Sequence, residues 1–400
     1  MASVLTRAVA SFAANATMCA AFDAKLTDAS RAVGGDTYAD LVSLSHRQVF
    51  GAMLFVTPTP SVGCPGVASR LGTCAFMEEM SSDGDVSTVD VLYPASPTIL
   101  YFSPTVMWQL MVPVFDYAAN CTNVPYNLAW APHHLGTWPI ADLSPNQQEQ
   151  MPMEESGNMI ILTAAVAKAS GGSVSFLAPY QWGLLQTWAE YINATLPNPP
   201  SQLCTDDFEG PEPNNTNLAL KGITALGAYA QMLRAGGRGT EAAEYESWAR
   251  AYVAYFLANA ISADGTHYRR QYNSPDTTFS LKYNTLYHYY LGLDLVPDSV
   301  MQTEIAFYTG PKAMTYGTPL DDRNNFTLFE YMAALVGVAS RAGAPGSQHS
   351  MTDALWRFAN TTQQRVPMTD WYSASTAAQV GFQARSTVGD IYALLLLNKR

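Results

Sequence analysis

Two adjacent glutamates are the first candidates for acid–base chemistry. Glu154 and Glu155 begin a predicted helix in the segment 153–159, Met-Glu-Glu-Ser-Gly-Asn-Met. Free backbone N–H groups stabilise a carboxylate at a helix N-terminus, so one interpretation of these residues is purely structural. A glutamate that faces a dry, aromatic pocket can instead act as a general acid or base. Successive helical residues point about 100° apart, so we expect at most one of the two to face a pocket centre.

The segment before these glutamates combines histidine, tryptophan and proline. It reads Ala-Pro-His-His-Leu-Gly-Thr-Trp-Pro over residues 131–139. We assign His133, His134 and Trp138 to substrate binding; hydrogen bonding within the loop, or packing of the indole beneath it, is the structural alternative. Adjacent histidines rarely ligate one ion, so the sequence predicts no metal site and no cofactor. Asn158 could help to bind substrate by stabilising an oxyanion.

Charged and aromatic residues recur in two later loops. The substrate-binding candidates there are Asp321, Asp322, Arg323, Trp371, Tyr372 and Arg385. Asp370 joins the two glutamates as a candidate catalytic acid or base. An arginine can clamp the α-carboxylate of an amino acid through two hydrogen bonds, or it can pair with an aspartate and tie two loops together. The aromatic residues could line a sugar or amino-acid pocket or pack beneath the loops.

Helices would position these residues, because apolar side chains recur at spacings of three and four along most of the chain. The periodicity predicts twelve helices, at residues 2–29, 36–56, 104–119, 153–169, 174–197, 217–236, 239–262, 281–292, 297–309, 325–343, 348–362 and 386–398. Two β-like runs, Thr73–Met77 and Val86–Leu92, flank the turn residues Ser81 to Gly84. They predict a small β-hairpin inserted in the helical body.

Connection lengths between the predicted helices alternate from residue 153 onward. Short connections at 170–173, 237–238, 293–296 and 344–347 alternate with long ones at 198–216, 263–280, 310–324 and 363–385. Antiparallel helices joined in this way place all long loops at one end, and six such hairpins can close into a ring. We therefore predict an all-α protein, one (α/α)6 toroid domain over residues 1–400, with the candidate residues on its long-loop face.

The alternation breaks once, where the connections 57–97 and 121–152 are both long. Pro104 and Pro113 could split the segment 98–120 into two helices and restore the pattern.

Composition excludes some classes of function. The chain has 400 residues with 33 acidic and 21 basic side chains, and its cations are scattered, which argues against a nucleic-acid partner. No apolar run reaches the ~18 residues that cross a bilayer, so we expect no membrane partner. The glycosylation signal Asn-x-Ser/Thr occurs at Asn15, Asn120, Asn193, Asn214, Asn325 and Asn360. These signals favour a secreted glycoprotein.

Cysteine and motif content add two expectations. Five cysteines leave at least one unpaired. We predict a Cys64–Cys74 disulfide and a buried thiol at Cys19. The motifs H-E-x-x-H, G-x-S-x-G, S-x-x-K, C-x-x-C, G-x-G-x-x-G and the P-loop are absent, so zinc proteases of that type, serine esterases and nucleotide binders lose their usual support.

At the loop motifs the sequence resembles the fungal glutaminase A family, specifically its six-helical-hairpin domain. The matching segments are 38–41 with 47–48, 131–139, 151–159, 282–284, 291–293, 316–321, 365–367, 370–372 and 381–385. Their joint order is far more specific than any single motif. The resemblance implies an α/α toroid, secretion, and hydrolysis of L-glutamine to L-glutamate and ammonia. It also implies a possible partner in a longer form, since full-length members look to carry an N-terminal β-rich region that nothing here matches.

Three functional hypotheses remain open. In the first, an amidohydrolase uses the candidate carboxylates to activate water against a side-chain amide, while Arg323 or Arg385 holds the substrate carboxylate. In the second, a glycoside hydrolase uses paired carboxylates and aromatic platforms to cleave a saccharide in the toroid cavity. In the third, the chain is an inactive fragment that lacks residues from an N-terminal region.

Overall fold

The fold is built almost entirely from helices. A computed structural model describes residues 2–57, 73–120, 122, 124–204, 207–364 and 367–399. The α-helices are α1 (Ala2–Gly51), α3 (Val89–Phe102), α4 (Pro104–Ala118), α5 (Pro152–Ala169), α6 (Pro179–Thr195), α7 (Thr216–Ala235), α8 (Gly239–Asn259), α9 (Leu286–Leu291), α10 (Asp298–Thr309), α11 (Phe329–Arg341), α12 (Pro345–Thr361) and α13 (Ala393–Asn398). Across the described ranges, no helix combines the length and apolarity needed to span a membrane.

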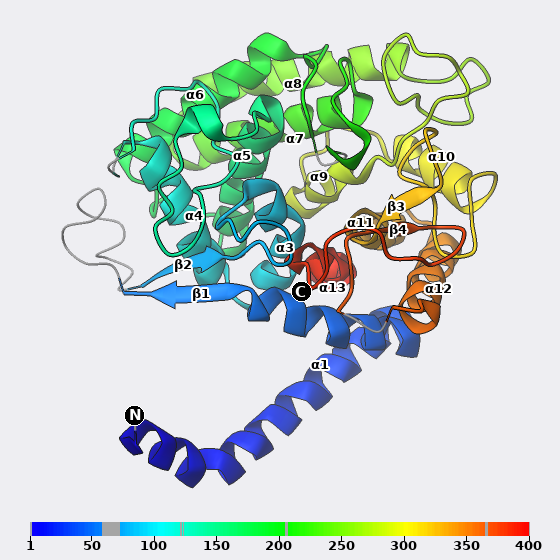
Figure 1. The fold of residues 1–400 in the computed structure, drawn as a ribbon. Helices are drawn as coiled ribbons and strands as arrows, with labels where there is room; N and C mark the ends of the chain where they lie inside the picture. The colour runs from blue at the N-terminus through cyan, green and yellow to red at the C-terminus, as the bar shows by residue number, and fades with distance from the viewer. Residues whose placement is uncertain are drawn as a thin grey trace.

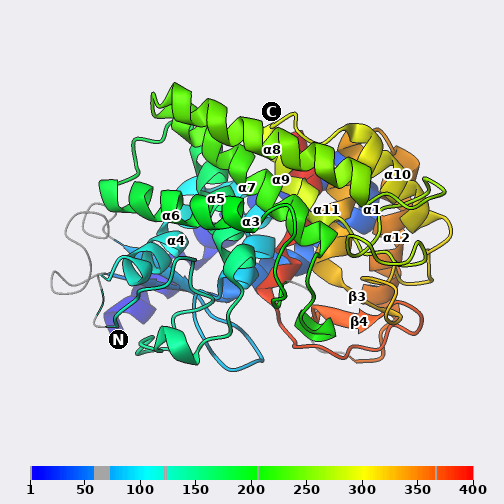
Figure 2. The same cartoon turned by 90° about the horizontal axis from the view of Figure 1, so that it is seen from above.

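The helices form an inner and an outer ring (Figure 1). Nearly every residue of α3, α5, α7 and α11 is buried, whereas α6 and α8 bury only one stripe. Each inner element contacts the next, in the order α3, α5, α7, α9 and α11. The 3₁₀ helix Ser386–Tyr392 contacts both α11 and α3 and so closes the ring. Helices such as α8 lie outside this ring (Figure 2). The predicted all-α, (α/α)6 toroid is therefore confirmed.

The first and last elements seal the ring. On the C-terminal part of α1, the hydroxyl of Tyr38 donates to the Ile391 carbonyl at 2.6 Å, and that of Ser45 donates to the Val388 carbonyl at 2.8 Å. These bonds tie the C-terminal part of α1 to the buried 3₁₀ helix Ser386–Tyr392. The N-terminal part of α1 projects away from the toroid and is exposed (Figure 1).

Two antiparallel hairpins accompany the helices. β1 (Met53–Val56) pairs with β2 (Cys74–Met77), and β3 (Phe326–Leu328) pairs with β4 (Trp371–Ser373). The predicted strand at 73–77 exists, but its main partner is β1, whose residues had been assigned to a helix. The predicted partner Val86–Leu92 meets it only at its start, where Glu78 and Val86 form an isolated bridge and the Ser87 N–H donates to the Met77 carbonyl at 2.7 Å. The second hairpin was not predicted. It matters for the site, since it joins the residue before β4 to the first residue of α11.

One predicted helix end and one predicted strand were also wrong. The two separate helices expected at 2–29 and 36–56 are confirmed, because α1 breaks at Gly35, whose φ of +80° is readily adopted only by glycine, but the second helix ends at Gly51 rather than at residue 56. Val86–Leu92 is no strand, because residues from Val89 onward begin α3. That helix is buried on almost every side, so it lacks the one-sided apolar pattern of a surface helix. Its presence restores the alternation of connections, with α4 starting at Pro104 as suggested.

The cysteine predictions fail. Cys74 is a buried free thiol, so the expected disulfide is not formed; Cys64 itself lies outside the described residues. Cys19 is exposed on the projecting part of α1 rather than buried. The single-domain assignment over residues 1–400 stays a prediction.

Candidate active site

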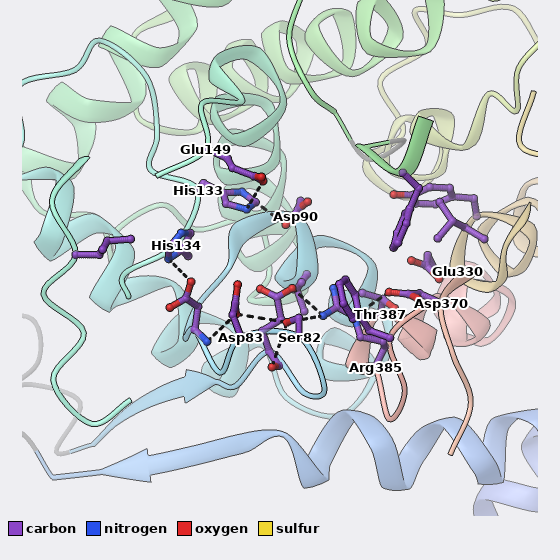
Figure 3. A pocket seen from close by; sticks show the side chains of 18 of the residues that line it. Ser82, Asp83, Asp90, His133, His134, Glu149, Glu330, Asp370, Arg385 and Thr387 are labelled. Atoms are coloured by element: carbon purple, nitrogen blue, oxygen red, sulfur yellow. Dashed lines mark hydrogen bonds and ion pairs between the residues drawn. The ribbon is translucent and has the colours of Figure 1, made fainter. Parts of the chain in front are cut away.

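A pocket of about 380 Å³ opens where inner helices begin. Asp90, Glu155 and Glu330 each lie in the first turn of an inner helix: α3, α5 and α11 respectively. Helix N-termini favour negative charge, which explains why carboxylates gather at this end of the ring. The acidic side chains that line the pocket are Glu79, Asp83, Asp85, Asp90, Glu149, Glu330 and Asp370. The basic side chains that face them are Arg385, His133 and His134, so the pocket is strongly acidic (Figure 3).

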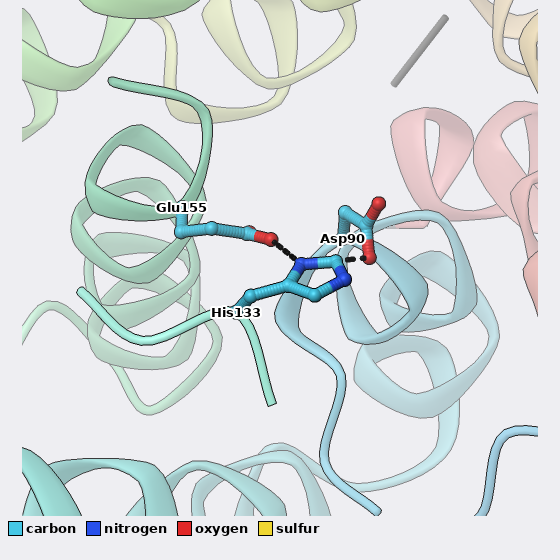
Figure 4. Close-up of side chains that lie close together, drawn as sticks. All are labelled: Asp90, His133 and Glu155. Carbon is cyan, nitrogen blue, oxygen red and sulfur yellow. Dashed lines mark hydrogen bonds and ion pairs between the residues drawn. The ribbon is translucent and has the colours of Figure 1, made fainter. Parts of the chain in front are cut away.

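At one wall, Asp90 and His133 line the pocket, and Glu155, which is buried behind them and does not line it, completes a cluster of three side chains (Figure 4). The Nδ1 atom of His133 lies 2.6 Å from Glu155 Oε1 and 3.9 Å from Asp90 Oδ1. Burial raises the pKa of Asp90 to about 8, although the neighbouring imidazolium opposes the shift. Burial alone would lower the pKa of His133, but the two carboxylates outweigh it and raise that pKa to about 10. Both shifts favour the protonated forms of Asp90 and His133 at neutral pH.

His134 is separate from this cluster. Its Nδ1 lies 3.0 Å from Asp85 Oδ2, and it lines the same pocket. Burial lowers its pKa, and the positive charge of His133 adds to the effect. The two adjacent histidines thus have different carboxylate partners and opposite pKa shifts.

The other wall carries Glu330 and Asp370, which lie beside Arg385 (Figure 3). The Phe329 N–H donates to the Asp370 carbonyl at 2.9 Å, which brings Asp370 beside Glu330. Arg385 Nε lies 2.9 Å from Asp370 Oδ2, and its Nη1 donates to Glu79 Oε1 at 2.7 Å. The guanidinium thus joins two carboxylates that lie about 290 residues apart in the chain.

Glu330 and Asp370 differ in how their surroundings affect their protonation. It raises the pKa of Glu330 to about 8, with the neighbouring Asp370 adding to the shift. Burial also raises the pKa of Asp370, but Arg385 and the Trp371 N–H, which donates at 2.7 Å, oppose the shift. A Cβ at position 381 would overlap Asp370 Oδ1, so Gly381 leaves room for this carboxylate. At neutral pH the pair holds a protonated Glu330 beside a carboxylate that a cation favours in its charged form.

Glu154 does not line the pocket; its side chain is buried between the inner helices α5 and α7. It forms an ion pair with Lys221, and both side chains are fully buried. Lys221 Nζ also donates to Asn158 Oδ1 at 2.7 Å, while the amide of Asn158 donates to Glu155 Oε2 at 3.0 Å. Glu154 is therefore placed as part of the core, and Asn158 orients Glu155 rather than facing substrate.

Phe208 and Phe382 line the pocket, and their ring centroids lie 6.0 Å apart. Trp371 stacks on Phe208 with ring centroids 5.3 Å apart, but it is buried and does not line the pocket. Tyr372 is buried: its hydroxyl donates to the Tyr316 carbonyl at 2.8 Å, away from the pocket. Trp138 packs near Phe76 and is not among the residues that line the pocket.

The triplet 321–323 lies outside this pocket. Arg323 Nε donates to Asp321 Oδ2 at 2.9 Å, and its Nη1 donates to the Glu209 carbonyl at 2.9 Å. Arg270 Nη1 donates to Asp322 Oδ1 at 3.0 Å. Asp321 and Asp322 line a neighbouring hollow instead. This network ties three loops together, which is the structural alternative that the sequence left open.

Six of the seven carboxylates that line the pocket escaped the sequence analysis: Glu79, Asp83, Asp85, Asp90, Glu149 and Glu330. Asp90 was hidden in a segment assigned to a strand, and Glu330 followed an apolar run that gave no polar signal. Glu79 sits after β2 in a segment without a motif. Contacts between distant segments are what identify these residues as part of one site. The one signal in the sequence for Glu79, Asp90 and Glu330 was their position at the start of a helix or the end of a strand.

This arrangement defines a class: an (α/α)6 toroid whose inner helices begin at an acidic pocket. Solved structures with the same fold include a wild-type glycosidase (TM-score 0.56, 12% identity, 90% of this chain and 97% of that one) and a glucoamylase from Saccharomycopsis fibuligera (TM-score 0.52, 10% identity, 81% and 86%). At these identities the likeness concerns the fold alone.

The chain belongs to the glutaminase A six-helical-hairpin domain family, whose model matches residues 35–395. It is 33% identical to glutaminase A of Aspergillus oryzae, over 96% of this chain and 54% of that protein. It is 25% identical to a probable glutaminase of Arthroderma benhamiae, over 91% of this chain and 50% of that protein. The chain thus spans about half the length of these relatives.

Proposed function

We propose that this chain is a hydrolase that releases ammonia from the side-chain amide of L-glutamine in the acidic pocket. The observation that carries the proposal is the pair Glu330 and Asp370, which presents a proton donor beside a proton acceptor at one wall. Membership of the glutaminase A family supports the choice of an amide substrate.

The pair suits amide chemistry because both proton transfers occur at atoms bonded to the same carbon. Asp370 takes a proton from water, and the water oxygen bonds to the amide carbon while the C=O π electrons move to oxygen. The intermediate collapses: the carbonyl re-forms, the C–N bond breaks, and the nitrogen leaves as ammonia with the proton of Glu330. The proton on Asp370 then returns to Glu330 or to solvent. General acid–base catalysis of this kind contributes about 10²- to 10⁴-fold.

The opposite wall offers the remaining contacts. An N–H of His133 at the cavity could stabilise the developing oxyanion. Asp83 and Glu149 supply negative charge for the α-ammonium group of glutamine. Arg385 is held by two carboxylates, so we assign it to orienting Asp370 rather than to clamping substrate.

A glycoside hydrolase is the second candidate. It is favoured by carboxyl groups on different walls, Asp90 from α3 and Glu330 from α11, together with the aromatic rings of Phe208 and Phe382. In this alternative the two carboxyls would act on opposite faces of a sugar ring.

One experiment separates these functions. The purified chain is assayed for ammonia release from L-glutamine and for reducing-sugar release from a glycan panel, with Glu330→Gln and Asp370→Asn as test variants. Asp322→Asn, in the neighbouring hollow, is the matched control. We expect ammonia release that both test variants lose and the control keeps. Sugar release without ammonia release would favour the glycoside hydrolase. The absence of both activities would favour the inactive fragment.

We further propose that the protein is secreted and glycosylated. The asparagines of four signals, Asn15, Asn120, Asn325 and Asn360, are exposed. Secretion from a eukaryotic host should therefore give a product whose mass falls on endoglycosidase treatment. An intracellular product with an unmodified mass would contradict this proposal.

A further inference from the structure

We propose that Asp90, His133 and Glu155 form a binding site for one divalent transition-metal ion at the pocket wall. Each side chain offers one ligand atom, and the three ligand atoms lie within 4.8 Å of one another (Figure 4). One imidazole nitrogen with two carboxylate oxygens is a donor set that suits Zn²⁺ or Mn²⁺. This inference is independent of the reaction proposed above.

The three ligands come from separate elements that are fixed to one another. The Val89 N–H donates to the His133 carbonyl at 2.7 Å, which ties the start of α3 to the loop that carries the imidazole. The His133 N–H in turn donates to Gln148 Oε1 at 3.1 Å. A metal site needs ligands held in place by such surrounding contacts, because each ligand that must be ordered on binding costs free energy.

The residues around the ligands also fit a metal site. Glu155 keeps Oε1 for the cluster because Asn158 donates to its Oε2 at 3.0 Å. Glu149 Oε2 lies 3.8 Å from the Nε2 atom of His133, on the ring edge away from the ligand atom. A carboxylate near the second ring nitrogen of a ligating histidine orients the ring and makes it a stronger ligand.

An orphaned oxygen points to a missing cation. Asp90 Oδ1, the proposed ligand atom, is buried and has no hydrogen-bond partner among the residues that the structure describes. A buried carboxylate oxygen without a partner is costly, and a cation at the cluster would satisfy it. The surrounding pocket carries further carboxylates, including Glu79 and Asp83, which attract divalent cations to the opening.

A proton and a metal ion compete for this place. His133 Nδ1 and Glu155 Oε1 lie 2.6 Å apart, close enough to share one hydrogen. A bound ion would take the place of that hydrogen, because imidazole and carboxylate groups bind metals in their deprotonated forms. With three protein ligands, the ion would keep an open position toward the pocket, as catalytic rather than structural sites do.

The test is metal binding by the full chain. Protein stripped with EDTA is titrated with ZnSO₄ and with MnCl₂ by calorimetry, and metal content is measured by mass spectrometry. The variants are Asp90→Asn, His133→Gln and Glu155→Gln. His134→Gln is the matched control, because this neighbouring histidine lines the same pocket but pairs with a different aspartate.

We expect one ion per wild-type chain, affinity reduced about tenfold or more in each of the three variants, and unchanged affinity in the control. Proton release on binding should accompany the wild-type titration. X-ray absorption of the zinc-loaded wild type keeps the test decisive if a variant fails to fold: it should show one imidazole and otherwise oxygen ligands. Absence of stoichiometric binding, absence of an imidazole ligand, or equal loss in His134→Gln would overturn the site.

Discussion

The ion pair inside the toroid allows a quantitative test of how the site is supported. Lys221 is fully buried, forms an ion pair with Glu154, donates to Asn158 at 2.7 Å and lies 4.2 Å from the ring centroid of Tyr93. Replacing it by methionine keeps most of the side-chain volume but leaves the carboxylate without its cation. A buried ion pair contributes little net stability over an apolar pair, whereas removal of one partner leaves an uncompensated charge.

We therefore expect Lys221→Met to lower the free energy of unfolding by about 3–5 kcal/mol. In the double variant Lys221→Met/Glu154→Gln neither charge of this pair is left unpaired, so the loss should be smaller than the sum of the single losses by about 2 kcal/mol, within the range of measured couplings between contacting residues. Because Lys221 also holds Asn158, which orients Glu155, the single variant should disturb the pocket wall as well.

Urea unfolding followed by circular dichroism measures these values, with Lys25→Met on the exposed part of α1 as the control. The control should change the free energy of unfolding by less than about 0.5 kcal/mol. A loss below about 1 kcal/mol for Lys221→Met, or strict additivity in the double variant, would refute the reasoning.

Three further predictions concern the second wall of the pocket. Gly381→Ala should push the Asp370 carboxylate aside and lower the rate of ammonia release about tenfold or more at unchanged helicity, while Gly346→Ala, where an added Cβ meets nothing, should keep the rate. Arg385→Lys should shift the acid limb of the pH–rate profile to higher pH, since a lysine cannot hold two carboxylates as the guanidinium does and the pKa of Asp370 then rises; an unmoved limb would contradict the assigned role. Because burial raises the pKa of Glu330 to about 8, above its unfolded value, stability should fall as pH rises from about 4.5 through 8, and unfolding titrations of Glu330→Gln should show a flatter dependence.

The fold was largely predictable from the sequence because it depends on a repeated, local signal. Helices such as α6 and α8 carry one apolar stripe, and the lengths of the connections between helices record which end of the ring each loop occupies. The signal fails where burial is complete: α3 is apolar on nearly all sides and contains Pro94 and Pro97, so no helical period marks it. The strand β1 was missed since four residues after a helix continue its apolar pattern.

The site was predictable only in part. A residue such as His133 or Arg385 could be recognised from the unusual composition of its own loop, and both residues line the pocket. Partners are set by contacts between distant segments, so the sequence did not distinguish Arg385, which joins two pocket carboxylates, from Arg323, which ties loops together. Glu154 and Glu155 face different surroundings because successive helical residues point about 100° apart. Which of the two lies in the core depends on Lys221, which pairs with Glu154 and leaves Glu155 to His133.

The most direct test of the proposed chemistry is the pH dependence of ammonia release from L-glutamine by the wild type and by Glu330→Gln. The account predicts wild-type activity that declines above pH 8, as Glu330 loses its proton, and a loss of about 100-fold in kcat for the variant together with disappearance of that alkaline limb. A Glu330→Gln protein that hydrolyses glutamine at close to the wild-type rate with the same alkaline limb would contradict the account.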